Sequence, residues 1–226
     1  MGEKDERKAE PTKKLQVYEI LKNRIVNNEL KSQEYLNEQA ICAELEVSKT
    51  PVREALQRLE RNHLVTIIPN KGCFVSSISI DSIREVFQVR EIFECAAARM
   101  AAGLPDKSRF VDMLENHESF KATNGEDVRR SLLSGYQIHG VIVNAVGNSI
   151  LEEYYNDILC HIVRIRIYTL SRLNVKRFSD TCREHKQVLK AIIASQADKA
   201  EQAMRDHLRH SFDSIDQLIR SNREEK

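Results

Sequence analysis

Residues that interrupt helices are scarce in this chain. Its 226 residues include seven glycines, four prolines and no tryptophan, and no internal repeat or low-complexity tract is visible. Glycine and proline are the residues that most often mark turns and end helices. Their scarcity excludes a turn-rich chain and predicts helices joined by short loops.

Cysteine is also sparse, and its pattern excludes two common uses of this residue. The five cysteines are scattered and odd in number, with no pair in the CxxC spacing. Neither a disulfide framework nor a zinc site built from paired cysteines is therefore expected. Buried, reduced cysteines fit a protein of the reducing cytoplasm.

Long apolar runs and a large net charge are the other absences. No apolar stretch reaches the length of about 20 residues that a membrane-spanning helix needs, so no membrane association is expected. Residues 1–11 are polar and charged, unlike a signal peptide, and are predicted to be a disordered tail. The formal net charge is only +1, so affinity for DNA would have to come from a local basic patch.

Residues 36–60 contain the pattern around which the N-terminal part is organised. Leu36–Leu45 is a short amphipathic segment, and Glu46–Thr50 connects it tightly to a second one that runs to Glu60. The apolar residues that recur at helical spacing in the second segment are Val52, Ala55, Leu56 and Leu59. Two helices joined by so short a connection form a helix-turn-helix.

The start of the second helix carries polar and basic side chains. Ser48 and Thr50 have oxygens suited to capping a helix, and Pro51 is tolerated in a first turn. Lys49 and Arg53 are four residues apart and therefore share a face. An ordinary solvated helix can show the same pair. A helix that presents Lys, Thr and Arg after a helix-turn-helix connection nevertheless suits the major groove of DNA.

A predicted hairpin follows these helices. Leu64–Ile68 and Cys73–Ser77 have the composition of short strands, and the Pro-Asn-Lys-Gly sequence at residues 69–72 has turn chemistry. Lys71 at the tip can meet phosphate or the minor groove. The hairpin is therefore predicted to be the wing of a winged helix.

Residues 12–78 resemble the winged helix of the GntR family of bacterial transcription regulators. The resemblance rests on LNEQAICAELEVSKTPVREALQRLERNHLVTIIPNKGCFV, which is similar to the family signature VSRTPVREAL…L…GLV…P.RG..V. The implied DNA contacts are Gln39, Lys49, Thr50, Arg53, Lys71 and Gly72, and Ser48 is a further candidate beside them. The chain departs from the family at Lys49, where arginine is usual, and at residues 62–63, where Asn-His replaces an acidic-glycine pair. Lysine keeps the charge but loses bidentate geometry.

Residues 79–226 have a helical pattern almost throughout, and Ser76–Ser79 is the visible boundary before them. Six helices are predicted, at Asp81–Leu104, Asp106–Thr123, Gly125–Val146, Asn148–Ser171, Asn174–Ser195 and Ala197–Arg223. Short loops between them favour antiparallel neighbours. The predicted fold is therefore mainly α: an N-terminal winged helix-turn-helix with a small β wing, and a C-terminal all-α six-helix antiparallel bundle.

Three of these predicted helices each place one histidine on an apolar face. The three are His139, His185 and His207. A single histidine in such a place is more often a core residue with a hydrogen-bond partner than a metal ligand. Three need more explanation, because each buried neutral imidazole requires a partner and one shared metal would serve all of them.

The same region is similar to the FCD domain that follows many GntR winged helices. The similarity covers about residues 81–220 and rests on Ile-His at 138–139, Glu-His at 184–185 and the residues before His207. In that family an aspartate one turn before the first histidine joins three histidines in holding a divalent metal, which helps to bind a small carboxylate effector. This chain has Gly135 in place of the aspartate. Three imidazoles can still hold Zn, Ni or Mn with open positions, although with lower affinity.

Arg90 is the main candidate for binding the carboxylate of an effector. It lies on an otherwise apolar stripe with Glu94 four residues further on, so an i,i+4 ion pair is the alternative. Arginine offers fork geometry to a carboxylate, and Arg90 matches an arginine of the FCD family's first helix. Tyr136, Arg164 and Arg166 are further candidates for effector contacts.

The sequence thus predicts a cytoplasmic, homodimeric transcription regulator that binds a palindromic operator in double-stranded DNA and responds to a small carboxylate. Two alternatives remain open. Because of Gly135, the chain could be a regulator that has lost sensing and binds DNA constitutively. A three-histidine metalloenzyme would need Glu184 as its base. Glu184 is expected to point away from the face of His185, so no enzyme is predicted.

Overall fold

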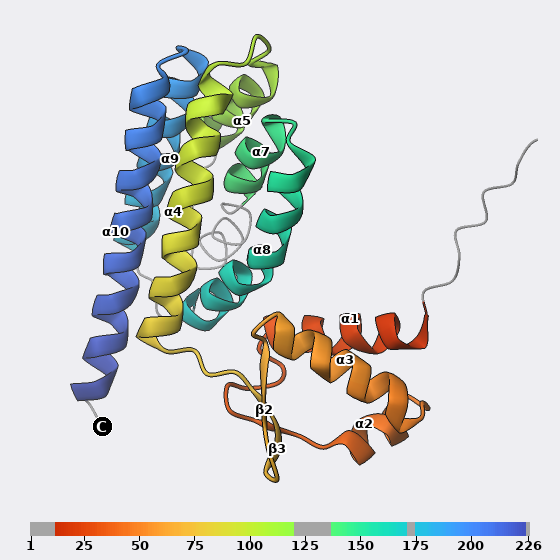
Figure 1. The fold of residues 1–226 in the computed structure, drawn as a ribbon. Coiled ribbons are helices and arrows are strands. Elements are labelled where there is room, and N and C mark those ends of the chain that lie inside the picture. Colours follow the sequence, from red (N-terminus) through yellow and green to blue (C-terminus); the bar gives the residue numbers. More distant parts are fainter. Residues whose placement is uncertain (1–11, 120–136, 171–174, 225–226) are drawn as a thin grey trace, which may run out of the picture. The chain divides into compact units, whose positions relative to one another are not determined.

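The computed structural model describes residues 12–119, 137–170 and 175–224. The chain divides into two compact units, Met1–Ser77 and Ile78–Lys226, and each has its own core (Figure 1). None of the described helices is both long and apolar enough to cross a membrane.

The first unit combines three helices with a small antiparallel sheet. Its elements are α1 (Lys13–Val26), β1 (Tyr35–Leu36), α2 (Glu38–Glu44), α3 (Lys49–Arg61), β2 (Val65–Ile68) and β3 (Gly72–Val75). The strand order is β1-β3-β2, so the predicted hairpin forms the larger part of the sheet. The core lies where the apolar face of α3 meets α1 and β2. The predicted winged helix is therefore confirmed.

The strand β1 was not predicted, because Leu36 was expected to begin a helix. Leu36 instead pairs with Cys73 in the sheet and is buried there. The helix begins only after Asn37, whose side chain accepts hydrogen bonds from the main-chain N–H groups of Gln39 at 2.9 Å and Ala40 at 3.1 Å. This N-cap fixes the helix start two residues later than the apolar pattern suggested.

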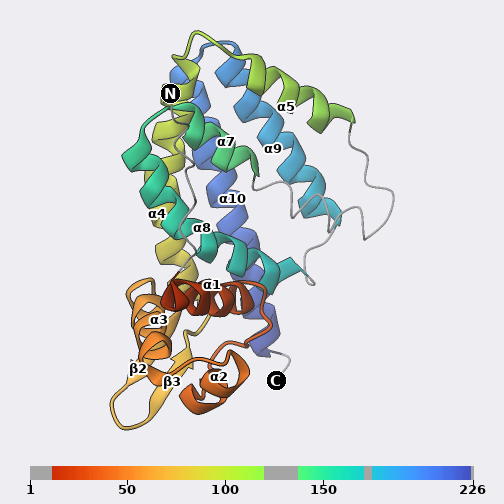
Figure 2. The same cartoon turned by 90° about the vertical axis from the view of Figure 1, so that its right-hand side faces the viewer.

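The second unit is a helical bundle. Its described elements are α4 (Ile80–Ala102), α5 (Ser108–Ser119), α7 (Gln137–Ala145), α8 (Ser149–Leu170), α9 (Val175–Ile193) and α10 (Ala197–Glu224). Helix α4 packs against α7, α8, α9 and α10, and α5 packs on α9 (Figure 2). The mainly α fold is confirmed. The helix predicted at Gly125–Val146 is described only from Gln137 onward, and its earlier part lies outside the described residues.

Helix α4 is the central element of this bundle, and its sequence explains why. It begins at Ile80 because Ser79 and Ser82 form a reciprocal capping box, with hydrogen bonds of 2.9 and 3.1 Å between side chain and main chain. Ala97, Ala98 and Ala101 are fully buried on it. Such small side chains let neighbouring helices approach closely.

Candidate functional sites

The N-terminal end of α3 presents the polar residues that the sequence analysis predicted to contact DNA. Lys49, Thr50 and Arg53 are exposed there, and Gln39 is exposed in the first turn of α2. Ser48 occupies the N-cap position and is exposed, but its side chain makes no capping hydrogen bond, contrary to expectation. The N-terminal end of a helix carries a partial positive charge, which suits phosphate. The geometry is therefore suited to a nucleic-acid surface.

Arg53 is held in place by the neighbouring helix. Its Nε donates to Oε2 of Glu38 on α2 at 2.9 Å, and the two side chains are 63% and 36% exposed. An ion pair so exposed is worth at most about 1 kcal/mol, so DNA can take the guanidinium at little cost. Arg58, further along α3, instead lies 4.1 Å from the ring centre of Tyr18 and ties α3 to α1.

The wing is shaped by a glycine and anchored to α3. Gly72 has a φ of +104°, which side-chain-bearing residues avoid, and a Cβ there would meet the ring of Tyr35 at 2.6 Å. Lys71 at the tip is exposed. The main-chain N–H of Ile67 donates to Oε1 of Glu60 on α3 at 3.0 Å. This bond sets the position of the wing relative to α3.

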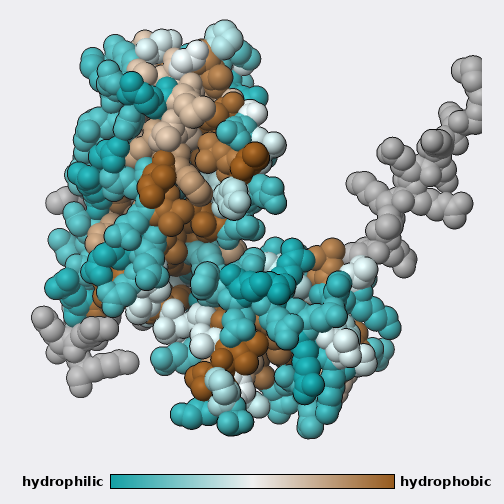
Figure 3. Space-filling model, viewed as in Figure 1, coloured by the Kyte–Doolittle hydropathy of each residue, from teal (hydrophilic) through white to brown (hydrophobic). Residues whose placement is uncertain are grey.

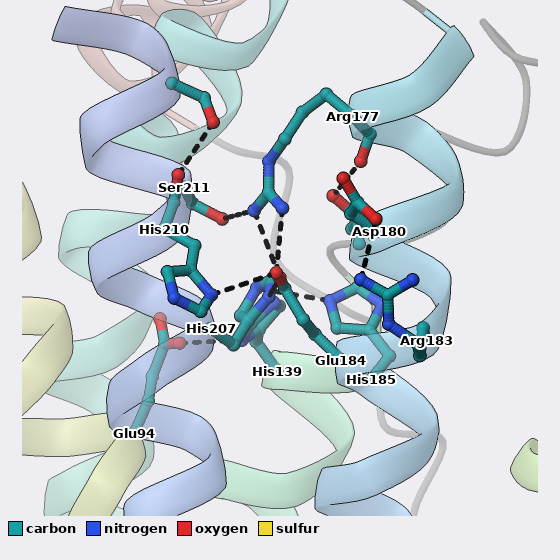
Figure 4. A network of polar contacts seen from close by, with 12 residues as sticks. Glu94, His139, Arg177, Asp180, Arg183, Glu184, His185, His207, His210 and Ser211 are labelled. Atoms are coloured by element: carbon teal, nitrogen blue, oxygen red, sulfur yellow. Dashed lines mark hydrogen bonds and ion pairs between the residues drawn. The ribbon is translucent and has the colours of Figure 1, made fainter.

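In the second unit, three buried histidines from α7, α9 and α10 meet (Figure 4). One ring nitrogen from each of His139, His185 and His207 lies within 4.8 Å of the other two. The Nε2 atoms of His185 and His207 are 3.3 Å apart. The structure thus brings together the three histidines that the sequence analysis singled out from separate helices.

Two of these rings, His139 and His207, have a carboxylate next to Nδ1. Nδ1 of His207 is 2.8 Å from Oε2 of Glu184. Nδ1 of His139 is 2.6 Å from Oε2 of Glu94, close enough for a hydrogen bond although the groups are not aligned for one. A carboxylate at Nδ1 favours the tautomer that carries its proton there and leaves Nε2 as a free lone pair. Metal-ligating histidines usually have this arrangement.

Burial controls the charge of these groups. It lowers the pKa of His139, and it lowers the pKa of His207 to about 3, although Glu94 and Glu184 oppose the two shifts. Both rings are therefore neutral near pH 7. Burial alone would raise the pKa of Glu94, but Arg90 and His139 outweigh it and hold that pKa below its usual range. Glu94 therefore remains an anion inside the bundle.

The donor set fits a divalent metal of the zinc type. Three imidazoles that each offer one ring nitrogen within 4.8 Å of the others can bind such an ion and leave positions open. Within the described part of the chain, the group that could act as metal ligands consists of the three histidines alone. Gly135, which stands where the FCD family has aspartate, and Tyr136, a predicted effector contact, lie outside the described residues.

Arg90 forms the ion pair with Glu94 that was the alternative to effector binding, and the pair is buried. Arg90 donates through Nε to Oε1 at 2.8 Å and through Nη2 to Oε2 at 3.3 Å. The hydroxyl of Tyr155 on α8 donates to Oε1 of the same carboxylate at 3.0 Å. Glu94 is fully buried, so this network links α4, α7 and α8. A charged pair on an otherwise apolar stripe was the signal for it in the sequence.

A narrow cavity borders the histidine cluster. His207 and three arginines, Arg90, Arg166 and Arg177, contribute to its wall. The cavity volume open to the centres of water molecules is about 60 Å³. This is room for a few waters. Two arginines of α8 were predicted as further effector contacts, and only Arg166 lines this cavity. Arg164 does not line it, and burial lowers the pKa of Arg164 to about 10.

Arg177 is a site residue that the sequence analysis did not predict. Its Nη1 and Nη2 donate to the two oxygens of Glu184 at 2.9 and 3.1 Å, and Nη2 also donates to Oγ of Ser211 at 2.8 Å (Figure 4). Glu184 therefore joins Arg177 to His207 within one network. One sequence pattern could have indicated it. Besides the apolar stripe that carries His185, α9 has a polar stripe in which Arg177, Thr181 and Glu184 recur at steps of four and three.

Comparison with known proteins assigns both units. Residues 13–75 match the family model "Bacterial regulatory proteins, gntR family", and residues 85–210, more than half of the chain, match the FCD domain. A curated relative, the HTH-type transcriptional repressor RspR of Escherichia coli (strain K12), is 25% identical over 208 residues, which cover 92% of this chain and 90% of RspR.

Two solved structures have a similar fold. A putative transcriptional regulator GntR from Rhodococcus sp. RHA1 aligns with a TM-score of 0.70 at 21% identity, over 91% of this chain and 98% of that one. E. coli McbR/YncC aligns with a TM-score of 0.68 at 18% identity, over 92% and 99%. At such identities the likeness concerns the fold alone.

Proposed function

The chain belongs to the GntR family of bacterial regulatory proteins and carries an FCD domain, and from this we propose that a small organic acid controls its affinity for an operator. The DNA-binding transcription regulators of this family are not enzymes. The observation that carries the proposal is the cavity wall that Arg90, Arg177 and His207 share. It supports recognition of an acid in a unit separate from the winged helix.

DNA recognition is assigned to the first unit. In the proposed complex α3 enters the major groove, where Lys49 and Arg53 donate to base edges. Ser48, Thr50 and Gln39 lie beside them and complete the contact surface. Lys71 and the main chain of Gly72, at the wing, meet phosphate or the minor groove. The support is the exposure of these side chains together with the anchored positions of Arg53 and the wing.

The regulator is proposed to act as a homodimer on a palindromic operator. One recognition helix reads only a few base pairs, and a two-fold dimer doubles the site. The proposed interface is the exposed apolar strip along α4 and onto its neighbours (Figure 3). Its exposed large residues are Ile92 and Met100 on α4 and Ile150 and Tyr154 on α8. Exposed apolar surface of this kind usually marks a protein interface.

The effector is proposed to place its carboxylate against Arg90 and Arg177. His139, His185 and His207 would hold a divalent metal such as Zn²⁺, Ni²⁺ or Mn²⁺, which when bound supplies positive charge and an open position for the acid. Acid binding would then change the spacing of the two winged helices in the dimer. The expected coupling free energy is roughly 1–3 kcal/mol, or about 5- to 150-fold in operator affinity.

The test is thermal melting of protein stripped of metal and resupplied with Zn²⁺, Ni²⁺ or Mn²⁺, each with and without a panel of small carboxylic acids. Acids that stabilise the protein are then added to operator-binding titrations. Stabilisation that His139→Ala removes, together with altered operator affinity, supports the proposal. If no acid alters melting or operator binding, the chain is a regulator that binds DNA constitutively.

A further inference from the structure

We infer that the effector is a compact monocarboxylic acid with an apolar body, and not a hydroxy acid or sugar acid. This ligand class rests on the proposed function, because it takes the cavity of the second unit as the effector site. The inference follows from the chemistry of the cavity wall.

Apolar side chains form a continuous part of the cavity wall. Five large apolar side chains contribute to it from four helices: Phe87 of α4, Ile162 and Ile165 of α8, Phe178 of α9 and Ile215 of α10. All five are buried, and Phe87, Ile165 and Ile215 belong to one continuous apolar cluster. A ligand atom that touches this surface gains affinity if it is apolar, by about fourfold for each buried CH₂ group.

Three of the four hydroxyl groups on the described wall already donate within the protein. Thr169 donates to the carbonyl of Ile165 at 3.0 Å and Thr181 to that of Arg177 at 2.9 Å. Ser214 likewise donates to the carbonyl of His210 at 2.8 Å. Such internal hydrogen bonds use up the hydroxyl protons and leave only acceptor lone pairs facing the cavity.

The fourth hydroxyl belongs to Ser211, which accepts a hydrogen bond from Arg177 at 2.8 Å and keeps one proton that it can donate. A ligand with several hydroxyls needs donors as well as acceptors, and an unpaired buried hydroxyl is unfavourable. Among the described wall residues, the arginines are the principal donors, and their geometry suits a carboxylate. The wall therefore favours a ligand whose polarity is concentrated in its acid group.

A single acid group is expected. Arg90 and Arg177 each share a carboxylate with the protein already, through Glu94 and Glu184. Every carboxylate of a ligand is repelled by these anions, so a second one adds further repulsion. The narrowness of the cavity also limits the ligand to a few non-hydrogen atoms beyond its acid group unless the walls move.

The experiment compares acids of equal chain length that differ only in hydroxylation. Calorimetric titrations of the full chain, metal-stripped and Zn²⁺-loaded, use butyrate against 2,3,4-trihydroxybutyrate and hexanoate against gluconate, with benzoate as a compact aromatic acid. The expected result is at least tenfold tighter binding of the unsubstituted acid in each pair. Tighter binding of the hydroxylated acids overturns the ligand class but leaves acid sensing intact. Absence of binding by every acid overturns both.

Two variants test whether the residues of this cavity wall contact the acid. Arg177→Gln should weaken binding of the apolar acids at least tenfold, whereas Arg183→Gln should not, because Arg183 is exposed on the same helix and pairs with Asp180. Ile165→Thr removes apolar surface from the wall and adds an oxygen that can accept from a ligand hydroxyl, so it should narrow the preference for hexanoate over gluconate. This second variant keeps the inference falsifiable if Arg177→Gln does not fold. If Ile165→Thr prefers hexanoate over gluconate as strongly as the parent protein does, this wall does not contact the body of the acid.

Discussion

Glu94 on α4 joins His139 to Arg90: its Oε2 lies 2.6 Å from Nδ1 of His139, and its Oε1 accepts a 2.8 Å hydrogen bond from Nε of Arg90. One buried carboxylate therefore joins the proposed effector arginine to a proposed metal ligand. Glu184 does the same on the other side, between Arg177 and His207. Through these two anions, a change at the cavity wall reaches the histidine cluster directly.

Glu94→Gln is expected to lower the free energy of unfolding of the metal-free protein by about 3–5 kcal/mol, because Arg90 would remain as a buried charge without its counter-ion. The matched control is Glu91→Gln on the same helix, where the carboxylate pairs with Arg205 and Arg209 near the surface and should cost less than about 1 kcal/mol. Urea unfolding followed by circular dichroism measures both. Equal, small losses would show that the buried pair does not stabilise the bundle.

His185→Ala should abolish stabilisation by Zn²⁺. At a free Zn²⁺ concentration of about 100 times the dissociation constant, the parent protein should gain about 2.7 kcal/mol, because the ion binds the folded chain. His210→Ala is the control: His210 lies one turn from His207, its side chain is 60% exposed, and it contacts Glu184 rather than the cluster. Thermal melting with and without Zn²⁺ makes the comparison. An equal Zn²⁺ shift in both variants would place the metal elsewhere.

Arg53→Ala should weaken specific operator binding by about 1–3 kcal/mol, or roughly 5- to 150-fold, without changing the melting temperature. The fold should tolerate it because the ion pair with Glu38 is exposed. Arg61→Ala, in the last turn of the same helix, is the control for loss of charge alone. The operator is first obtained by selection from random duplex DNA. If Arg53→Ala binds the operator with unaltered sequence specificity, Arg53 does not contact the base edges.

Ile92→Glu should shift the protein from dimer to monomer in sedimentation equilibrium. Ile92 is 67% exposed on α4 and belongs to the proposed interface, and a charge there would have to be buried on association. Val111→Glu, on the exposed side of α5, provides the control. A dimer that persists in Ile92→Glu would move the interface to another face, and a monomeric parent protein would contradict the dimer itself.

Local patterns in the sequence were sufficient for the family and for most elements. The connection between α2 and α3 and the turn at Gly72 follow from a few neighbouring residues, so their prediction is confirmed. The predictions of where helices begin were wrong where a local hydrogen bond was misjudged. Asn37 caps α2 and leaves Leu36 to the sheet. Ser48 takes the N-cap position without making the expected bond.

The sequence by itself determined the winged helix, the helical bundle and the apolar faces that carry three histidines, because each depends on the order of residues within one element. Only the tertiary structure decided which carboxylates contact the Nδ1 atoms of two of those histidines. Glu94 and His139 lie on different helices, as do Glu184 and His207, and no periodicity within one helix predicts such a contact. Packing of α4, α7, α9 and α10 places them. Burial then keeps His207 neutral, whereas Arg90 and His139 keep Glu94 ionised against its burial.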